Sequence, residues 1–472
     1  MQAYSQLLLQ QADCLQRTHF LRGSLQLLKT ARHGLHKQQR CRQLCLSVSS
    51  KAGHGKPKLV GMGGCGLDML AQVATFPEPD TKSRTEQMET QGGGNAGNAL
   101  TSAARLGLSR PALITKIGSD SVGDQILAEL EGDGVDVSHV LRAPNAPSPF
   151  TYIIVDREGG TRTCIHTPGE PLSQEEMTEE KVEAALAGAT LIYFDGRLTE
   201  AALVVARAAK AKGIKVLVEA ERLRPNLEAL LAEADYVFTS AKYPQECTGE
   251  SCLADALIGL MGALPKAEWV LTTLGKRGSV LLQREAQPAD GCREAELQAV
   301  LDELLTAAQA EAESHEQPGC TSKSGVHIRA GAVKSSEGPL TLLCTTPAEG
   351  QNAAAMELAK ASAAAAAASA NADSSNAAAY SRQEASSPRQ PATSFCATVT
   401  VSTAASLPSD AVQDTTGAGD AYLGAILHSL STGLKLEKAM RLAAVVAACK
   451  CTALGSRPGL PRHVDIHDQL LR

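Results

Sequence analysis

The stretch from Ala189 to Val237 places the strongest constraint on the fold, because strand-like and helix-like segments alternate there without a break. The apolar runs LIYFDG, IKVLVEA and DYVFTS have the length of buried strands, and helical segments from Glu200 to Lys212 and from Pro225 to Glu233 separate them. Strands joined by helices in this way lie parallel in one sheet, with helices on its faces. The pattern therefore predicts an α/β fold.

Acidic residues follow two of these strands. Asp195 comes at the end of the first strand, and Glu219 and Glu221 at the end of the second. Open α/β sheets bind ligands at the carboxyl ends of their strands, so we expect the binding site at this edge. The glycines after the earlier strand LVGMGG could instead cradle a dinucleotide, but no GxGxxG opens a helix there.

The segment DTTGAGDAYLGAIL, residues 414–427, places a glycine-bearing turn directly before a predicted helix. Its apolar residues Leu423, Ile426, Leu427 and Leu430 recur at helical spacing. The first N–H groups of a helix have no partner within the helix, and the helix dipole adds partial positive charge there. The turn Gly417–Gly419 can therefore hold an anion such as a phosphate.

Asp420 lies in the first turn of the same predicted helix. A carboxylate beside a phosphate site would repel the phosphate, and so its presence favours a chemical role. Asp420 could take the proton of a hydroxyl while the N–H groups stabilise a transferred phosphoryl group. The alternative is that Asp420 only stabilises the helix N-terminus and that the glycines only form a turn.

The segment GGGNAGNALTSAARLG, residues 92–107, predicts a second helix that follows a glycine run. Asn95 and Asn98 are three residues apart, so they can face the same side of its first turn. Two amides offer donors and acceptors that suit neutral hydroxyl groups. The alternative for Asn95 is that it caps the helix.

These two segments resemble the signatures of the ribokinase-like, or PfkB, family of carbohydrate kinases. DTTGAGDAYLGAIL is similar to the C-terminal signature, and the GGNAGN run is similar to the sugar-binding segment of the ketohexokinase type. The resemblance implies a three-layer α/β fold with a Rossmann-like central sheet and a small β lid. It implies ATP-dependent phosphorylation of a sugar hydroxyl, with ATP and Mg²⁺ as cofactors, and leaves open a monovalent cation such as K⁺.

The resemblance also assigns roles to individual residues. The family's Asn-x-x-Glu metal element is absent near Ser240, and Glu246 is the carboxylate that could replace it. The implied sites are as follows: Asp420 as catalytic base with Gly417, Ala418 and Gly419 as the anion hole; Asp68, Gly94, Asn95 and Asn98 for the sugar; Asp414, Thr415 and Gly275 for the nucleotide; and Glu246 for the metal.

Strand-like segments in the ranges 71–91 and 148–167 match the β lid that covers the sugar in this family. The second range, SPFTYIIVDREGGTRTCIHT, alternates as an exposed strand pair does. Such lids often mediate dimer contact, so the resemblance implies a homodimer formed through the lid. A plain edge hairpin with no further role is the alternative.

Composition divides the chain into three parts. Residues 1–55 carry many basic residues, including Arg17, Arg22 and Lys29, against the single acid Asp13, which predicts an organelle transit peptide. The serine-rich end of this segment favours a chloroplast over a mitochondrion, and a disordered basic arm is the alternative. Residues 56–285 and 396–472 form the predicted kinase domain. The range 286–395 includes one predicted helix and an alanine-rich, low-complexity tract, and we expect it to be a largely disordered insertion.

The net charge of −6 gives no reason to expect nucleic acid as a partner, and no stretch of eighteen apolar residues suggests a membrane span. A small-molecule sugar is the expected substrate. Two alternatives remain open from the sequence. Nucleoside kinases share the DTxGAGD pattern, although aromatic residues for base stacking make up only 3% of this chain. A catalytically silent scaffold in an organelle complex is the other alternative, although GAGD is intact here.

Overall fold

The computed structural model describes residues 58–285, 297–314, 319–321, 327–329, 333–334, 340–345 and 394–472. The predicted transit peptide, residues 1–55, lies outside the described residues, and the organelle assignment stays a prediction. The alanine-rich tract of the expected insertion also lies outside them. Within the range 286–395, the described residues include helix α9 (Leu297–Ser314), where a helix was expected.

Short strands also occur in this range, and some of them join the central sheet. Strand β16 (Leu340–Thr345) pairs antiparallel with β17 (Ser394–Ser402), and β15 (Val333–Lys334) pairs with the same strand. The apolar sequence LTLLCT of β16 suits this position beside a buried neighbour. Strands β13 (Gly319–Thr321) and β14 (His327–Arg329) form a separate pair. These residues of the range thus carry regular structure.

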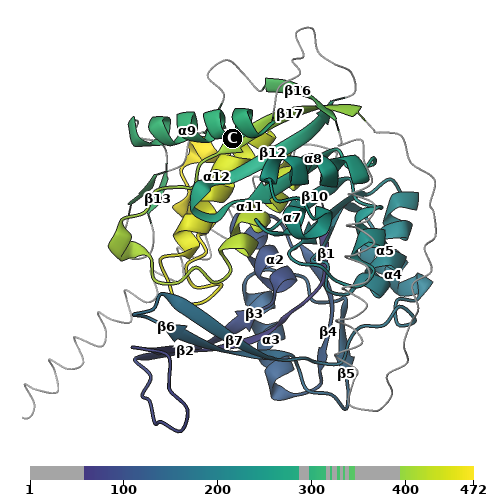
Figure 1. Ribbon diagram of the computed structural model, residues 1–472. Coiled ribbons are helices and arrows are strands. Elements are labelled where there is room, and N and C mark those ends of the chain that lie inside the picture. Colours follow the sequence, from purple (N-terminus) through teal and green to yellow (C-terminus); the bar gives the residue numbers. More distant parts are fainter. Residues whose placement is uncertain are drawn as a thin grey trace, which may run out of the picture. The chain divides into compact units, whose positions relative to one another are not determined.

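The central sheet is mixed and has 11 strands, in the order β15-β17-β12-β11-β10-β9-β8-β1-β4-β5, with β16 beside β17 (Figure 1). The neighbours from β11 through β9, β8 and β1 to β5 are parallel, and those from β11 to β17 are antiparallel. The remaining strands of this sheet are β1 (Lys58–Met62), β4 (Ala112–Gly118), β5 (Val140–Ala143), β8 (Ala189–Phe194), β9 (Lys215–Ala220), β10 (Tyr236–Thr239), β11 (Trp269–Thr273) and β12 (Ser279–Glu285).

Helices cover both faces of this sheet, which gives the predicted three layers. The central strands are apolar on both sides because each side packs on a helical layer. In β8, for example, Leu191 and Tyr193 join one core, whereas Ile192 and Phe194 join the other. None of the described helices is long and apolar enough to cross a membrane. The core that includes Leu191 and Tyr193 contains residues of α2 (Asn95–Arg105), α3 (Ser121–Gly132), α11 (Ala418–Thr432) and α12 (Leu436–Lys450). The core that includes Ile192 and Phe194 contains residues of α4 (Glu179–Leu186), α5 (Thr199–Ala211), α6 (Leu227–Leu231) and α8 (Leu253–Ala263).

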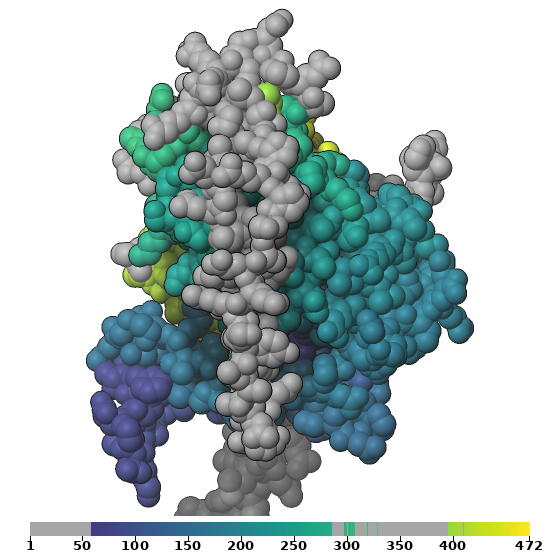
Figure 2. Space-filling model, turned by 45° about the vertical axis from the view of Figure 1, so that its right-hand side comes forward, coloured from purple at the N-terminus to yellow at the C-terminus, as the bar shows by residue number. Residues whose placement is uncertain are grey.

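A separate four-stranded sheet forms the lid, in the order β3-β2-β6-β7. Its strands are β2 (Gly66–Val73), β3 (Gln87–Gly93), β6 (Phe150–Asp156) and β7 (Thr161–Thr167). The connection between β2 and β3, purple in Figure 2, extends away from the other described residues. Asp68, Thr151 and His166 lie opposite one another in the strand register, so they share one face. Tyr152 and Ile165 share the other face and are largely exposed.

Helices α2 and α11 cross at very short distance, and this crossing positions the candidate site. A Cβ atom at Gly424 of α11 would lie 2.4 Å from Cβ of Ser102 and 2.5 Å from the carbonyl oxygen of Ala99, both in α2. The hydroxyl of Ser102 donates to the carbonyl oxygen of Ala421 at 3.2 Å. Only glycine at position 424 permits this approach.

We expect Gly424→Ala to lower the free energy of unfolding by about 1–3 kcal/mol, because the overlap with α2 outweighs the gain in helix propensity. Denaturant titration of both proteins measures this difference. Gly132→Ala is the matched control, since a Cβ atom there meets nothing within 4 Å and should leave stability equal or higher. Equal stability of the Gly424→Ala and wild-type proteins would contradict the tight crossing.

Candidate active site

The glycine turn before α11 has the conformation that the anion-hole prediction needs. Gly417 has φ 74°, and a Cβ atom at this residue would lie 2.8 Å from Cβ of Ser456. Both the left-handed backbone and the close neighbour favour glycine. The N–H of Ala418 already donates to the carbonyl oxygen of Thr415 at 3.2 Å, whereas Gly419 and Asp420 have no carbonyl four residues earlier within the helix. Their N–H groups are therefore the better candidates for binding an anion.

Asp420 is held by a chain of hydrogen bonds that starts at a buried arginine. Nε of Arg457 donates to Oδ1 of Asn98 at 3.0 Å, and Nδ2 of Asn98 donates to Oδ2 of Asp420 at 2.8 Å. Because Arg457 can only donate, it fixes which end of the Asn98 amide faces Asp420. Arg457 is 2% exposed, and Asn98 is 3% exposed. The structure thus brings two predicted site residues into direct contact, Asn98 and Asp420.

The surroundings of Asp420 favour its protonated form more than water would. Burial raises the pKa of Asp420, and the nearby carboxylates of Glu221 and Asp195 raise it further. The hydrogen bond from Asn98 and the charge of Arg197 oppose them, and the resulting pKa is about 6. At neutral pH Asp420 is mostly ionised but much more basic than an ordinary aspartate, which suits a general base.

Asp68 lies on the lid strand β2, on the same face as Thr151 and His166. Burial raises the pKa of Asp68 to about 6, although the charge of Arg457 lowers it. A Cβ atom at Gly93 would lie 2.2 Å from the carboxylate of Asp68, so this glycine makes room for it. Gly94, also a predicted sugar residue, precedes α2 with φ 86° and packs against the backbone of Gly64.

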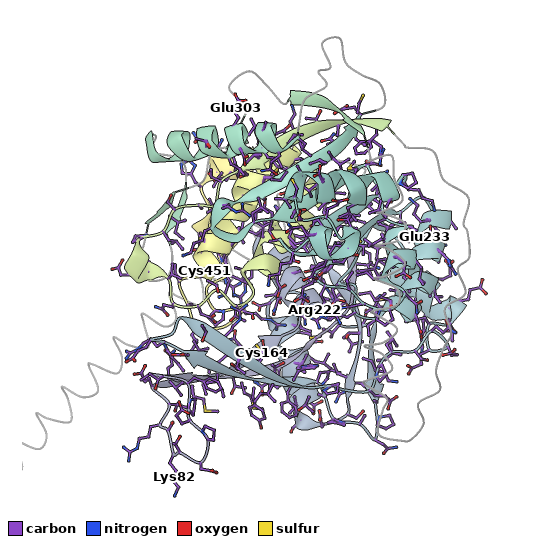
Figure 3. All side chains as sticks on the ribbon, viewed as in Figure 1. Lys82, Cys164, Arg222, Glu233, Glu303 and Cys451 are labelled. Carbon is purple, nitrogen blue, oxygen red and sulfur yellow. The ribbon has the colours of Figure 1, made fainter. Side chains whose placement is uncertain are left out.

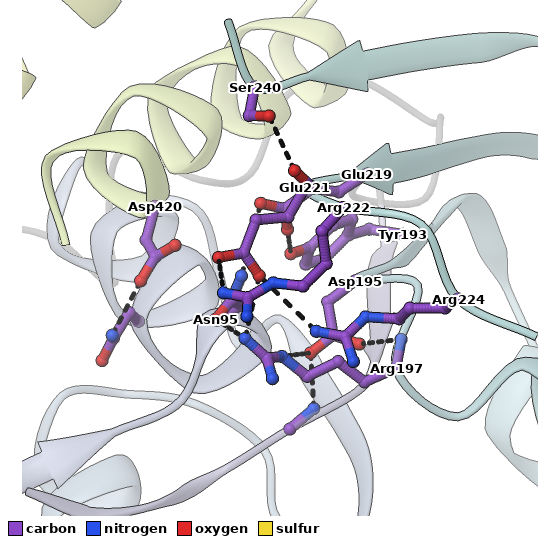
Figure 4. A network of polar contacts seen from close by, with 12 residues as sticks. Asn95, Tyr193, Asp195, Arg197, Glu219, Glu221, Arg222, Arg224, Ser240 and Asp420 are labelled. Atoms are coloured by element: carbon purple, nitrogen blue, oxygen red, sulfur yellow. Dashed lines mark hydrogen bonds and ion pairs between the residues drawn. The ribbon is translucent and has the colours of Figure 1, made fainter. Parts of the chain in front are cut away.

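Asn95 is engaged differently from Asn98. Its amide nitrogen donates to Oε1 of Glu219 at 3.4 Å, and its oxygen accepts from Nη2 of Arg197 at 3.0 Å (Figure 4). Both polar ends of Asn95 are therefore held by protein groups. The N-cap position of α2 belongs to Gly94, so the alternative of helix capping by Asn95 does not hold.

The acidic residues at the strand ends form a buried polar layer beside Asn95. Oη of Tyr193 donates to Oε2 of Glu219 at 2.5 Å. Burial raises the pKa of Glu219 well above its ordinary value, and the charge of Asp420 raises it further. Asp195 accepts from the N–H groups of Gly64 at 2.5 Å and of Arg197 at 3.0 Å. A Cβ atom at Gly63 would overlap the Asp195 carboxylate, which explains the glycine at this position after β1.

Asp414 organises the turn that precedes the anion site. Its Oδ1 accepts from the N–H and the hydroxyl of Thr416, and its Oδ2 accepts from the N–H of Gly455 at 2.8 Å. Burial raises the pKa of Asp414, but the charge of Lys450 and these hydrogen bonds outweigh burial and lower it overall. Across the turn, the lid residue Arg162 donates to the hydroxyl of Thr415 at 3.2 Å. The turn is thus held by the hydrogen bonds of Asp414, and it contacts the lid through Arg162.

Two predicted residues stand apart from this group. Gly275 begins a short turn (Gly275–Arg277) between β11 and β12 with φ 59°, and a Cβ atom at this residue would meet nothing within 4 Å. Glu246 is exposed in the first turn of α7 (Tyr243–Thr248). Across the part of the chain that the structure describes, no three His, Cys, Asp or Glu side chains gather in a metal-binding group. A metal here would therefore need oxygen ligands from a bound nucleotide as well.

Several arginines of the site were absent from the sequence-based prediction. Arg197, Arg222 and Arg224 follow β8 and β9, directly beside the acidic residues that were chosen for lying at strand ends. Selecting charged residues at the carboxyl ends of the strands would have included these three arginines. Arg162 and Arg457 carry no such signal, because their partners lie 253 and 359 residues away in the chain.

The fold and this geometry are those expected of a small-molecule phosphotransferase of the α/β type, and the comparison with protein families identifies such a class. The model of the pfkB family of carbohydrate kinases matches residues 57–298 and 391–463. The chain therefore belongs to the pfkB carbohydrate kinase family, and its fold is ribokinase-like with a large mixed sheet and a four-stranded lid.

The individual relatives have low sequence identity to this chain. Ketohexokinase of Mus musculus is 27% identical over 229 residues, which cover 47% of this chain and 76% of the relative. The structure of Arabidopsis thaliana ribokinase with ribose and ATP superposes with a TM-score of 0.54 at 17% identity, covering 88% of this chain and 99% of the other. An E. coli protein in complex with ATP and Mg²⁺ superposes equally well, with a TM-score of 0.54 at 15% identity, covering 88% and 99%.

The raised pKa of Asp420 predicts a pH-dependent effect on stability. A carboxyl group whose pKa rises from 3.8 unfolded to about 6 folded binds its proton more tightly in the folded state. The wild-type protein therefore loses stability as pH rises through this window, whereas Asp420→Asn has no such loss. We expect the melting temperature of Asp420→Asn, relative to wild type, to be higher at pH 7.5 than at pH 4.5.

Thermal unfolding at both pH values measures this difference. Asp255→Asn, at an exposed position on α8, is the control and should show no comparable pH dependence. A difference of the opposite sign would mean that Asp420 is stabilised as the anion in the folded protein.

Proposed function

We propose that this protein transfers the terminal phosphoryl group of ATP to a hydroxyl group of a sugar, with Asp420 as the general base. The observation that carries the proposal is the placement of Asp420. Its carboxylate is oriented by Asn98, lies at the N-terminus of α11, and has a pKa of about 6. Membership in a carbohydrate kinase family supports the reaction class.

In the proposed step, the sugar hydroxyl oxygen attacks the terminal phosphorus of ATP while its proton passes to Asp420. An O–P bond forms to the sugar, and the O–P bond to ADP breaks, so that ADP leaves with the bonding electron pair. The N–H groups of Gly419 and Asp420 stabilise the charge on the transferred group. Arg162 contacts Thr415 from the lid, and in this proposal it contributes positive charge near the transferred group.

The sugar would lie between the lid and α2. Asp68 offers a carboxylate from the lid, and Asn98, whose amide is engaged by Arg457 and Asp420, would border the sugar and orient Asp420 toward it. Asn95 would act mainly by holding Arg197 and Glu219, because both ends of its amide are engaged. Asp414, with Thr415, would hold the turn near the nucleotide phosphates, and Gly275 would border the nucleotide.

ATP and Mg²⁺ are proposed as cofactors, since structural relatives contain them. Mg²⁺ usually takes one or two protein carboxylates together with substrate phosphates. An exposed carboxylate such as Glu246 fits that requirement, whereas Asp414 is occupied by three hydrogen bonds. When bound, Mg²⁺ would neutralise charge on the phosphates. A monovalent cation such as K⁺ stays a proposal from the family resemblance.

A homodimer through the outer face of the lid is a further part of the proposal. Met88, Tyr152 and Ile165 are 63%, 49% and 54% exposed on the lid strands β3, β6 and β7, with β2 between β3 and β6. Exposed apolar residues gathered on one sheet face favour a protein partner, and a second copy offers the same face.

We expect Asp420→Asn to stay folded and to lose about 10²- to 10⁴-fold in kcat, the usual contribution of a general base. ADP release is measured with ribose, fructose, other ketoses, myo-inositol and adenosine as acceptors. Turnover of adenosine alone would favour a nucleoside kinase. Near-wild-type activity of Asp420→Asn, against an unaffected Asp255→Asn control, would rule out Asp420 as the base.

The pH dependence of kcat/KM should follow the same carboxylate. Because the base works only when ionised, we expect activity to fall tenfold per pH unit below about pH 6, near the pKa of Asp420. Initial rates between pH 4.5 and 8, at saturating ATP, measure this profile. Constant activity down to pH 4.5 would contradict a base with this pKa.

A further inference from the structure

A cluster of arginines lies at the carboxyl ends of β8 and β9, and two of them, Arg222 and Arg224, have no role in the chemistry described so far. Arg197 follows β8, and Arg222 and Arg224 follow β9 (Figure 4). Figure 3 labels Arg222 on the side of the central domain that faces the lid strand carrying Cys164. Carboxyl ends of parallel strands are where α/β sheets bind ligands.

One carboxylate, that of Glu221, forms ion pairs with all three guanidinium groups. Glu221 contacts Arg197 at 3.0 Å, Arg222 at 2.7 Å and Arg224 at 3.7 Å. Asp195 lies 4.0 Å from Arg197, but its oxygens already accept from the N–H groups of Gly64 and Arg197. Asp195, Glu219 and Asp420 also act on Arg197, so several carboxylates offset the positive charge of the cluster. Each guanidinium has five N–H donors, however, whereas Glu221 has two acceptor oxygens, so N–H donors of the cluster remain for the oxygens of an added anion.

The cluster is anchored but still accessible. The hydroxyl of Ser240 donates to the backbone carbonyl of Glu221 at 2.7 Å, which holds the segment after β9 in place. The side chains of Arg197, Arg222 and Arg224 are 33%, 61% and 24% exposed. A purely structural ion-pair network would explain Glu221 and one arginine. It does not explain three guanidinium groups, all partly open to solvent, on one carboxylate.

Arg197 links this cluster to the acceptor side of the active site. Its Nη2 donates to Asn95 in the first turn of α2, the helix that also carries Asn98. Burial and the charge of Arg197 lower the pKa of the lid residue His166, and the charge of Arg197 partly opposes the rise in the pKa of Asp420. Arg197 thus lies near both the proposed base and the lid face that holds Asp68.

We propose that Arg197, Arg222 and Arg224 form an anion-binding subsite for the acceptor, so that the physiological acceptor is a sugar carrying an oxyanion group. Planar guanidinium groups bind carboxylate and phosphate through paired hydrogen bonds, and both kinds of group fit here. This inference rests on the proposed kinase function. The terminal phosphate of ATP is the other source of an oxyanion, and the experiment separates the two.

Matched acceptors provide the first arm of the test. We compare kcat/KM at saturating ATP within two sets of acceptors. The first set is glucose, gluconate and glucose 6-phosphate, and the second is ribose, ribonate and ribose 5-phosphate. We expect an anionic sugar to exceed its neutral counterpart at least tenfold, which corresponds to one charge-assisted contact. Preference for gluconate and ribonate identifies a carboxylate subsite, and preference for the phosphates identifies a phosphate subsite. Preference for the neutral sugars overturns the inference and leaves the kinase proposal intact.

Substitutions provide the second arm. Arg222→Gln and Arg224→Gln should each raise KM for the anionic acceptor about 10- to 100-fold, with KM for ATP and the rate on the neutral sugar little changed. Arg207→Gln, at an exposed position on α5, is the matched control and should change none of these constants. A rise in KM for ATP instead would assign the cluster to the nucleotide and overturn the inference.

Binding without turnover separates failure of this inference from failure of the kinase proposal. Calorimetry of the Asp420→Asn protein with each of the four anionic sugars should show binding that Arg222→Gln weakens. Such binding with no turnover by the wild-type protein would support the subsite and contradict the kinase function. Absence of binding to all four would overturn the subsite.

Discussion

The close crossing of α2 and α11 is the contact on which the proposed active site depends. Gly424 lets the two helices approach until a single methyl group would overlap Ser102 and Ala99. This approach places Asn98 within 2.8 Å of Asp420, although the two residues lie 322 positions apart in the chain. The N-terminus of each helix then points toward the same region, one with an amide and the other with a base and free N–H groups.

Buried charge around this crossing has a consistent chemical effect. Asp68, Asp195, Glu219 and Asp420 all have pKa values raised mainly by burial. Arg457 and Arg197 oppose this effect, since each places a guanidinium close to at least one of these carboxylates. The site thus keeps carboxylates that are unusually basic and cations that prevent their complete neutralisation. Such a balance suits proton removal from a hydroxyl and charge stabilisation in the same small region.

Much of the fold could be predicted from the chain alone. The strand at Lys58, the alternating elements from 189 to 237, the helix after Gly417 and the lid strands β6 and β7 occur where they were predicted. The lid strand β2 (Gly66–Val73) begins before the expected range 71–91. Local patterns suffice there because apolar periodicity and glycine turns act within a few residues. The strands β15 and β16 differ, because they lie in a range where composition pointed to disorder. These two strands form by pairing with β17, and no pattern in the local sequence predicts that pairing.

The sequence by itself determined the family signatures, the candidate anion-binding turn and the identity of the candidate base, because each depends on a short contiguous segment. Only the tertiary structure decided how those segments meet. It showed that Arg457 orients Asn98, that Asn95 is held at both ends, and that three arginines share Glu221. Contacts of this kind join residues from distant strands and helices, and their geometry depends on how the layers pack, which local sequence does not encode.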